Sequence, residues 1–182
     1  MRLFNIIFVI IIVVFIVSCK ANNNQWIGKK ILFPNEIIFT RYLTDTLNYS
    51  ISDSKFKIVL SVDSNGCTGC KLQLDRWKEY ISYMDTIASN NICFLFFIQS
   101  KNLEEFKYIL INEEFEYPLC IDTKGIFAYI NHIWGDEVFL IDENNRIIAT
   151  GNPTQDVLVE KTYFKLITKC LGTHSKKLGI ME

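Results

Sequence analysis

Residues 58–70 read IVLSVDSNGCTGC, an apolar run followed by two cysteines that are three positions apart. The run begins at Phe56, and its β-branched residues are typical of a buried strand. After the cysteines, apolar residues recur at spacings of three and four, the period of one helical face: Leu74, Trp77, Ile81, Met84 and Ala88. The sequence therefore predicts that the cysteine pair lies between a buried strand and an amphipathic helix.

The predicted position of Cys67 and Cys70 suits thiol–disulfide exchange. A helix N-terminus presents unpaired N–H groups that carry about half a positive charge, and this charge lowers the pKa of a nearby thiol. A second cysteine one turn later can attack a mixed disulfide and release the product. We therefore predict that Cys67 is the exposed attacking thiol and that Cys70, screened by the first helical turn, resolves the intermediate.

Other uses of this cysteine pair remain open. A structural zinc site normally takes four ligands in two pairs, but there is no second C-x-x-C, and His132 and His174 lie far apart. The pair could also be a structural disulfide or two unused thiols. Soft thiolates suit copper(I), although no methionine or histidine cluster accompanies them. We expect no metal and no cofactor.

Outward from this motif, strand and helix patterns alternate along the chain. Ile92–Ile98 (ICFLFFI) is apolar throughout, which predicts a central strand covered on both faces. The order of patterns predicts an α/β sandwich with parallel early strands and a closing antiparallel hairpin. The remaining predicted elements are an irregular or edge-strand segment at Ile31–Phe39, a helix capped by Asn102, a strand at Leu119–Ile121, a helix from Asp122 or Thr123 through Ile133, strands at Val138–Ile141 and Arg146–Thr150, and a helix from about Gln155 to Leu171.

The N-terminus has the layout of an exported lipoprotein. Arg2, an apolar run and Ser18-Cys19 follow the pattern of a secretory signal. The 15 residues Leu3–Val17 would form a helix of about 22 Å, shorter than the roughly 30 Å hydrocarbon core of a bilayer. The tetrapeptide Ile16-Val17-Ser18-Cys19 resembles the lipobox of bacterial lipoproteins, which implies cleavage before Cys19 and a lipid on that cysteine. The alternative is an ordinary signal peptide in which Cys19 is incidental.

We predict one folded domain behind this targeting segment. The signal peptide is residues 1–18, the tether 19–25, the domain 26–172 with its core at 56–172, and a polar, loose tail follows at 173–182. The expected location is the cell envelope, and Lys20 in place of aspartate favours the outer membrane. With 20 acidic and 19 basic residues, the formal net charge of −1 gives no reason to expect a nucleic-acid partner.

Four segments resemble the thioredoxin-like fold, and specifically the membrane-tethered disulfide reductases of the TlpA type. They are IVLSVDSNGCTGC, YPLCIDTKGIFAYI, EVFLIDENNRIIATG and the last helix. The resemblance implies a three-layer α/β sandwich, with a mixed sheet and helices on both faces, and reversible thiol–disulfide exchange at Cys67 and Cys70. The implied partners are thiols and disulfides of exported proteins and an upstream membrane reductant.

Several positions depart from that family. Gly66 stands where a tryptophan is usual, and Gly69 where a proline is favoured. Asp136, or Glu137 with the gap moved by one, stands where a cis-proline normally faces the two sulfurs. A cis bond before another residue costs about 2.5–4 kcal/mol, so we expect a trans bond, and a carboxylate there would raise the thiol pKa. A redox-inactive binding lipoprotein of the same fold is therefore the alternative function.

The other cysteines and two tryptophans are expected to pack in the core. Cys93 lies in an apolar strand and Cys170 on an apolar helix face, where a free cysteine behaves as a small hydrophobic residue. Cys120 is either a core residue or a second redox partner. Trp77 and Trp134 are expected to be packing anchors.

Overall fold

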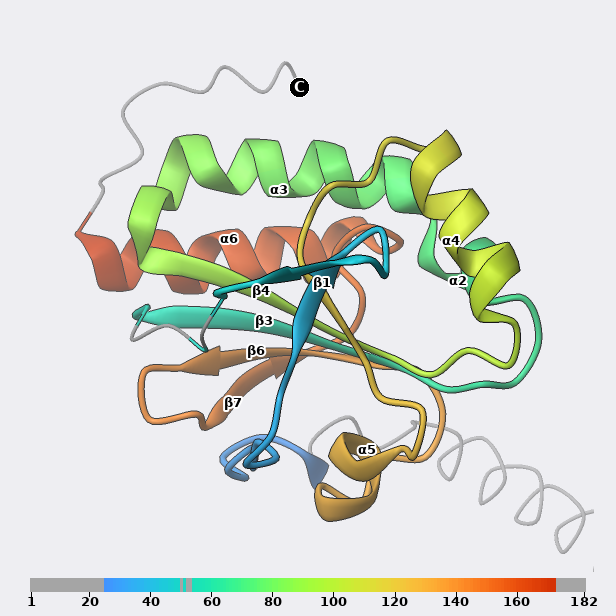
Figure 1. Ribbon diagram of the computed structural model, residues 1–182. Helices are drawn as coiled ribbons and strands as arrows, with labels where there is room; N and C mark the ends of the chain where they lie inside the picture. Colours follow the sequence, from blue (N-terminus) through green and yellow to red (C-terminus); the bar gives the residue numbers. More distant parts are fainter. Residues whose placement is uncertain (1–24, 50, 52–53, 173–182) are drawn as a thin grey trace, which may run out of the picture.

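A computed structural model describes residues 25–49, 51 and 54–172 of the chain (Figure 1). The predicted signal peptide, Cys19, all of the tether except Gln25, and the C-terminal tail lie outside these residues. No helix within the described part is long and apolar enough to cross a membrane.

In the part of the chain that the structure describes, seven strands form one mixed sheet in the order β2-β1-β5-β4-β3-β6-β7. The central strands β3, β4 and β5 run parallel, and β6 and β7 join them antiparallel. This arrangement confirms the parallel early strands and the closing hairpin that the sequence predicts. The strands are β1 (Phe39–Arg41), β2 (Asp45–Leu47), β3 (Phe56–Val62), β4 (Ile92–Ile98), β5 (Leu119–Ile121), β6 (Glu137–Asp142) and β7 (Ile147–Thr150).

Helices cover both faces of the sheet and complete the predicted three-layer sandwich. The two long helices α3 and α6 lie over one face, and α5 lies over the other together with the N-terminal segment (Figure 1). The helices are α2 (Thr68–Leu72), α3 (Leu74–Ala88), α4 (Leu103–Asn112), α5 (Ile126–Ile130) and α6 (Val157–Leu171), with a 3-10 turn at Ser89–Asn91.

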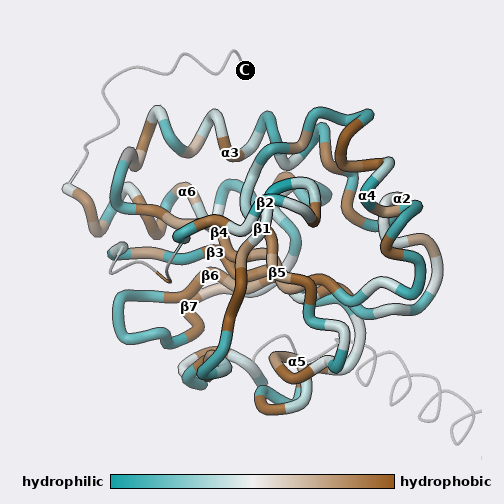
Figure 2. Tube along the Cα trace, in the orientation of Figure 1, coloured by the Kyte–Doolittle hydropathy of each residue, from teal (hydrophilic) through white to brown (hydrophobic). Residues whose placement is uncertain are grey.

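Alternating side chains of the central strands build two apolar layers. Ile58 and Leu60 pack with α3 and α6, whereas Val59 packs with the opposite face, where the rings of Phe97 and Phe127 stack with centroids 3.9 Å apart. All residues of β3 and β4 are buried, and hydrophobic stretches, drawn brown, gather where the strands cross the middle of the molecule (Figure 2). Trp77 is fully buried, which confirms its predicted packing role. The core thus fixes the ends of β3 and α3, between which the cysteine motif lies.

The helix predicted from Asp122 or Thr123 through Ile133 is shorter at both ends, since α5 begins at Ile126, after Gly125, and ends at Ile130. The Asp122 carboxylate caps it by accepting hydrogen bonds from the N–H groups of Ile126 and Phe127, both at 2.8 Å. The helix ends at Ile130 instead of Ile133 because the side chain of Asn131 bonds the N-terminal segment. Its amide oxygen accepts a hydrogen bond from the backbone N–H of Leu32, and its amide nitrogen donates to the carbonyl oxygen of Leu32, both at 2.8 Å.

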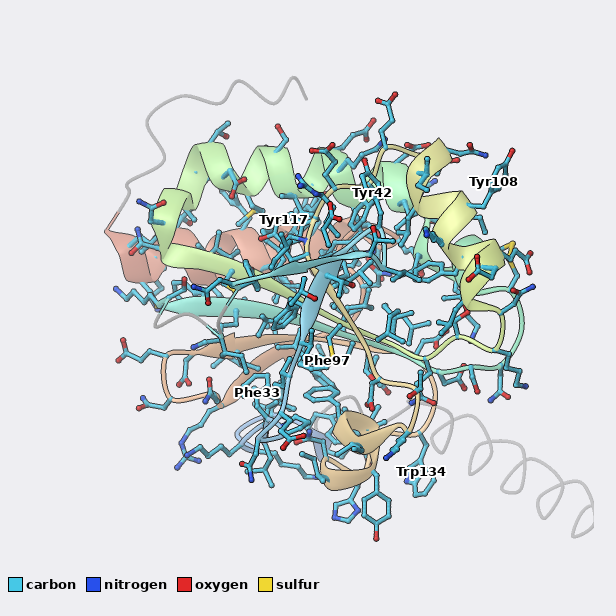
Figure 3. The ribbon with its side chains drawn as sticks, viewed as in Figure 1. Phe33, Tyr42, Phe97, Tyr108, Tyr117 and Trp134 are labelled. Carbon is cyan, nitrogen blue, oxygen red and sulfur yellow. A yellow bond between two sulfur atoms is a disulfide. The ribbon has the colours of Figure 1, made fainter. Side chains whose placement is uncertain are left out.

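Trp134 lies just beyond this early helix end and is 86% exposed, so its predicted packing role is wrong. The side chain projects away from the domain beside α5 (Figure 3).

Candidate functional site

Cys67 lies at the N-terminus of α2, as the sequence predicts. The chain leaves β3 at Val62 and turns through Gly66, whose φ of +78° is a conformation that glycine adopts without strain. Cys67 is the N-cap residue of α2, and its Sγ accepts a hydrogen bond from the backbone N–H of Cys70 at 3.1 Å. A sulfur in this position is stabilised in its thiolate form by the donor and by the helix dipole.

Cys67 and Cys70 are joined by a disulfide, with their Cα atoms 5.3 Å apart. Both cysteines are exposed, so the expectation that the first helical turn screens Cys70 is wrong. The helix α2 is only five residues long and ends at Gln73, which adopts a left-handed conformation with φ 48°. Gly69, between the cysteines, has no side chain to cover them. A short helix and a glycine therefore leave both sulfurs open to a partner.

The close approach of α4 explains the glycine at position 69. A Cβ atom on Gly69 would lie 2.6 Å from Cδ1 of Ile109 on α4, well inside van der Waals contact. Beside this contact, residues of α2, α3 and α4 border a groove of about 500 Å³ that both cysteines line. The other lining residues are Gly69, Gln73, Leu74, Asp75, Arg76, Ile109 and Glu113.

On the other side of α2, a lysine joins two aspartates. The Nζ atom of Lys71 donates to the carboxylate of Asp63 and lies 3.2 Å from that of Asp136. Asp136 also accepts a hydrogen bond from the backbone N–H of Asp63 at 2.9 Å. This three-residue ion bridge ties the loop before β6 to the end of β3. Our sequence reasoning missed Lys71, whose one signal was its position directly after Cys70.

The ion bridge changes the expected effect of Asp136 on the thiols. The described residues contain no cis peptide bond, so the bonds before Asp136 and Glu137 are trans as expected. The carboxylate of Asp136 is paired with a cation, and this pairing offsets its negative charge at the sulfurs. Glu137 is half-buried at the start of β6, and burial, followed by the charge of Asp136, raises the pKa of its carboxyl.

The pKa values of the bridge reflect competition between burial and pairing. Burial by itself would raise the pKa of Asp63, but hydrogen bonds from Lys71 and Asn65 outweigh it and hold that pKa below its usual value. Burial would lower the pKa of Lys71, whereas its contacts with the two aspartates raise it. Lys71 and Asp63 therefore both remain charged at neutral pH.

The remaining described cysteines lie apart from this motif. Cys93 is buried in the sheet, as predicted, and Cys120 is buried there too, which favours the core alternative for it. Burial, and then the charge of Asp122, raise the pKa of the Cys120 thiol to about 11, so it is a poor nucleophile at neutral pH. Cys170 is exposed, and its predicted core position is wrong because it lies in the last turn of α6, beyond the buried residues Tyr163 and Ile167.

Within the described residues, no group of three or more histidine, cysteine, aspartate or glutamate side chains could hold a metal ion. Cys67 and Cys70 are bonded to each other through their sulfur atoms. The arrangement of the two cysteines is suited to thiol–disulfide exchange.

The comparison with solved structures identifies the fold. No family model and no curated protein matches the sequence. Among solved structures, the thioredoxin domain of a thiol-disulfide oxidoreductase from Bacteroides vulgatus is 13% identical, with a TM-score of 0.57 over 78% of this chain and 97% of that one. A mutant of PrxQ from Xylella fastidiosa is 13% identical, with a TM-score of 0.56 over 79% and 96% of the two chains.

A third structure, peroxidoxin BcpB from Mycobacterium tuberculosis, is 12% identical, with a TM-score of 0.53 over 82% of this chain and 98% of that one. At sequence identities this low, the structural similarity shows the fold alone. The seven-stranded mixed sheet, the helices on both faces and the C-x-x-C motif at the start of α2 agree with it. The chain therefore has the thioredoxin-like fold, which the sequence predicts.

Proposed function

We propose that this chain is a thiol–disulfide oxidoreductase that reduces disulfides of exported proteins. The observation that carries the proposal is the geometry of Cys67 and Cys70. The two sulfurs are bonded and exposed at the start of a helix, and a backbone N–H donates to the sulfur of Cys67. A buried structural disulfide would not need this exposure or this donor.

The proposed reaction starts from the reduced protein. The thiolate of Cys67 attacks one sulfur of a substrate disulfide, forms a mixed disulfide and releases the other substrate sulfur as a thiolate. The thiolate of Cys70 then attacks Sγ of Cys67 and releases the second substrate sulfur. Two electrons pass from the protein to the substrate, two protons end on the substrate thiols, and the protein is left with the disulfide of the structure. A membrane-bound dithiol donor is the proposed source of new electrons.

We place this activity in the cell envelope through a lipid on Cys19. The support is the sequence: a charged start, an apolar run too short to span a bilayer comfortably, and a lipobox-like tetrapeptide. The compartment outside the cytoplasm is also where protein disulfides persist and where a reductase for them has substrates.

One observation favours the alternative of a redox-inactive binding protein. The ion bridge of Asp63, Lys71 and Asp136 takes the place where the related family has a cis-proline, so the substrate contacts made there in that family are altered. A protein with this alternative function would hold a partner without exchanging its disulfide.

A single-turnover experiment separates the two functions. The reduced chain is mixed with an equal amount of a small disulfide-bonded protein, quenched in acid, alkylated and analysed by mass spectrometry. The oxidoreductase should form its Cys67–Cys70 disulfide while the substrate gains two alkylated thiols. A variant with both cysteines replaced by serine is the control. Equal results for this control and the wild type would support the binding protein.

A further inference from the structure

The helix α5 and the loop after it carry exposed apolar and aromatic side chains. Within this helix Phe127 is buried against the sheet, whereas Ile126 is 44% and Tyr129 is 78% exposed. Trp134, in the loop, is also exposed and projects away from the domain (Figure 3). Large apolar side chains that gather on one exposed part of a protein mark a surface that meets a partner.

The N-terminal segment lies beside α5 and extends this surface (Figure 1). Ile31 packs in the same apolar layer as Phe127, and the backbone of Leu32 is hydrogen-bonded to the side chain of Asn131. The side chains of Ile27 and Leu32 are exposed. Two stretches of chain that are far apart in the sequence therefore form one surface.

We call the exposed side chains of residues 25–33 and 123–135 the α5 surface. These two stretches contain three lysines, all exposed, and no aspartate or glutamate, although the whole chain has 20 acidic residues against 19 basic ones. The lysines are Lys29, Lys30 and Lys124. The carboxylates that flank the second stretch are engaged, because Asp122 accepts hydrogen bonds at the start of α5 and Asp136 is paired with Lys71. The α5 surface thus combines aromatic, aliphatic and positively charged groups.

This combination suits the surface of a lipid bilayer. Tryptophan and tyrosine rings lie at the level of the headgroups in membrane interfaces, and each lysine near anionic headgroups strengthens association about fivefold. Gln25, where the described segment begins, is six positions after Cys19, and six extended residues span about 20 Å. A lipid on Cys19 would therefore keep the α5 surface within reach of the bilayer.

We propose that the α5 surface docks on an anionic bilayer, with the rings of Tyr129 and Trp134 among the headgroups. The inference rests on the proposed lipid on Cys19 and adds that the folded domain itself contacts the membrane. The chain from Trp134 leads within two residues to Asp136, a member of the ion bridge beside the disulfide. Docking therefore fixes how the disulfide faces the membrane.

Quenching of tryptophan fluorescence by lipid tests the docking. The full chain is produced with its own signal in a bacterium that lipidates exported proteins. It is then reconstituted into vesicles of phosphatidylcholine, with or without phosphatidylglycerol, whose acyl chains carry bromine close to the headgroup. Trp26 and Trp77 are buried, so lipid should quench Trp134. Quenching should be strong in the anionic vesicles, and Trp134→Phe should abolish it.

Matched variants locate the contact. Tyr108→Trp in the Trp134→Phe background places an exposed tryptophan on α4, on another part of the domain (Figure 3), and it should not be quenched. Lys29→Gln combined with Lys124→Gln should lower the ratio of docked to undocked chain about 25-fold. Lys161→Gln, an exposed lysine of α6 over the opposite face of the sheet, should leave that ratio unchanged.

The outcomes separate the docking from the lipid anchor. If the chain stays on both kinds of vesicle and Trp134 is quenched on neither, the inference is overturned while the anchor stands, and a partner protein becomes the candidate for this surface. Equal quenching on the two kinds of vesicle would overturn the role of the lysines. If the chain associates with neither kind, the anchor and the docking both fail. Disulfide exchange with a soluble substrate is measured on the same samples and tests the proposed activity separately.

Discussion

The backbone N–H of Asp63, directly after β3, donates to the carboxylate of Asp136, directly before β6, at 2.9 Å. Lys71 of α2 reaches both carboxylates. Three segments that are far apart in the sequence are thus joined beside the disulfide by one side-chain cation. A trans peptide bond and an ion bridge occupy the position where the family that the sequence resembles has a cis-proline.

Replacing the cation tests the contribution of this bridge to stability. Lys71→Met should lower the free energy of unfolding by about 1 kcal/mol, the upper end for a partly exposed pair, because two carboxylates then lie together without a cation. Urea denaturation at pH 7 measures the change. Lys78→Met is the control, since its ion pair with Asp75 is more exposed, and a loss as large as that of Lys71→Met would contradict the prediction.

The pH dependence of that difference has a definite sign. The pKa of Asp63 is lowered in the folded protein, so its contribution is present above the unfolded value of about 3.9 and is lost as the pH falls through the folded value. The pKa of Lys71 is raised, so its contribution is present below about 10.4 and is lost as the pH rises through the folded value. The difference between wild type and Lys71→Met should be largest between about pH 5 and pH 10. If the difference in unfolding free energy between wild type and Lys71→Met does not change with pH, the pairing of Lys71 with Asp63 is not its source.

Cys67 should be the more acidic thiol of the reduced pair. The N–H of Cys70 and the start of α2 favour its thiolate, so its pKa should lie below the ordinary value of about 8.5. Removing a nearby negative charge with Asp136→Asn should lower it further. The pH profile of alkylation in a Cys70→Ser background measures both, with Asp45→Asn on the distant strand β2 as the control. An unmoved profile in Asp136→Asn would show that this carboxylate does not act on the sulfur.

The cysteines should divide into three classes by alkylation. In the oxidised native protein, Cys170 alone among the described cysteines should react, because it is exposed and free. Reduction should add Cys67 and Cys70. Cys93 and Cys120 are buried and should react only after denaturation. Peptide mapping by mass spectrometry gives the pattern, and labelling of Cys120 in the native protein would reopen its role as a second redox partner.

The lipid anchor is tested at Cys19. Cys19→Ala should leave the signal uncleaved or release the protein from membranes, as seen by fractionation and by the mobility of the mature chain. Cys170→Ala, which removes an exposed cysteine from α6, serves as the control and should not alter either property. Normal processing and membrane association of Cys19→Ala would rule out the lipoprotein.

The sequence predicts the central elements of this fold well because burial leaves a strong pattern. FKIVLSV and ICFLFFI are apolar on both faces, which is typical of covered parallel strands. The hairpin β1–β2 was missed because Tyr42 and Leu43 make its turn with φ of 53° and 57°. Turns with positive φ are normally recognised in a sequence by asparagine or glycine, so Tyr42 and Leu43 gave no indication of a turn.

The candidate site could be predicted only in part. The spacing and context of Cys67 and Cys70 were sufficient to locate them at a helix start. The ion bridge depends on the antiparallel pairing of β3 with β6, which brings residue 63 near residue 136. The exposure of Cys70 depends on where α2 ends at Gln73, a helix boundary that periodicity alone does not give.

Trapping of mixed disulfides tests the central claim most directly. Both single variants, Cys67→Ser and Cys70→Ser, are expressed in cells, quenched in acid, alkylated and separated on non-reducing gels. Cys70→Ser should accumulate adducts that disappear on reduction, because its nucleophile attacks but nothing resolves the product. Cys67→Ser should show few, since Cys70 lacks the N–H donor that Cys67 has. Adducts on neither variant would contradict the claim that this pair exchanges disulfides, and adducts mainly on Cys67→Ser would reverse the roles of the two cysteines.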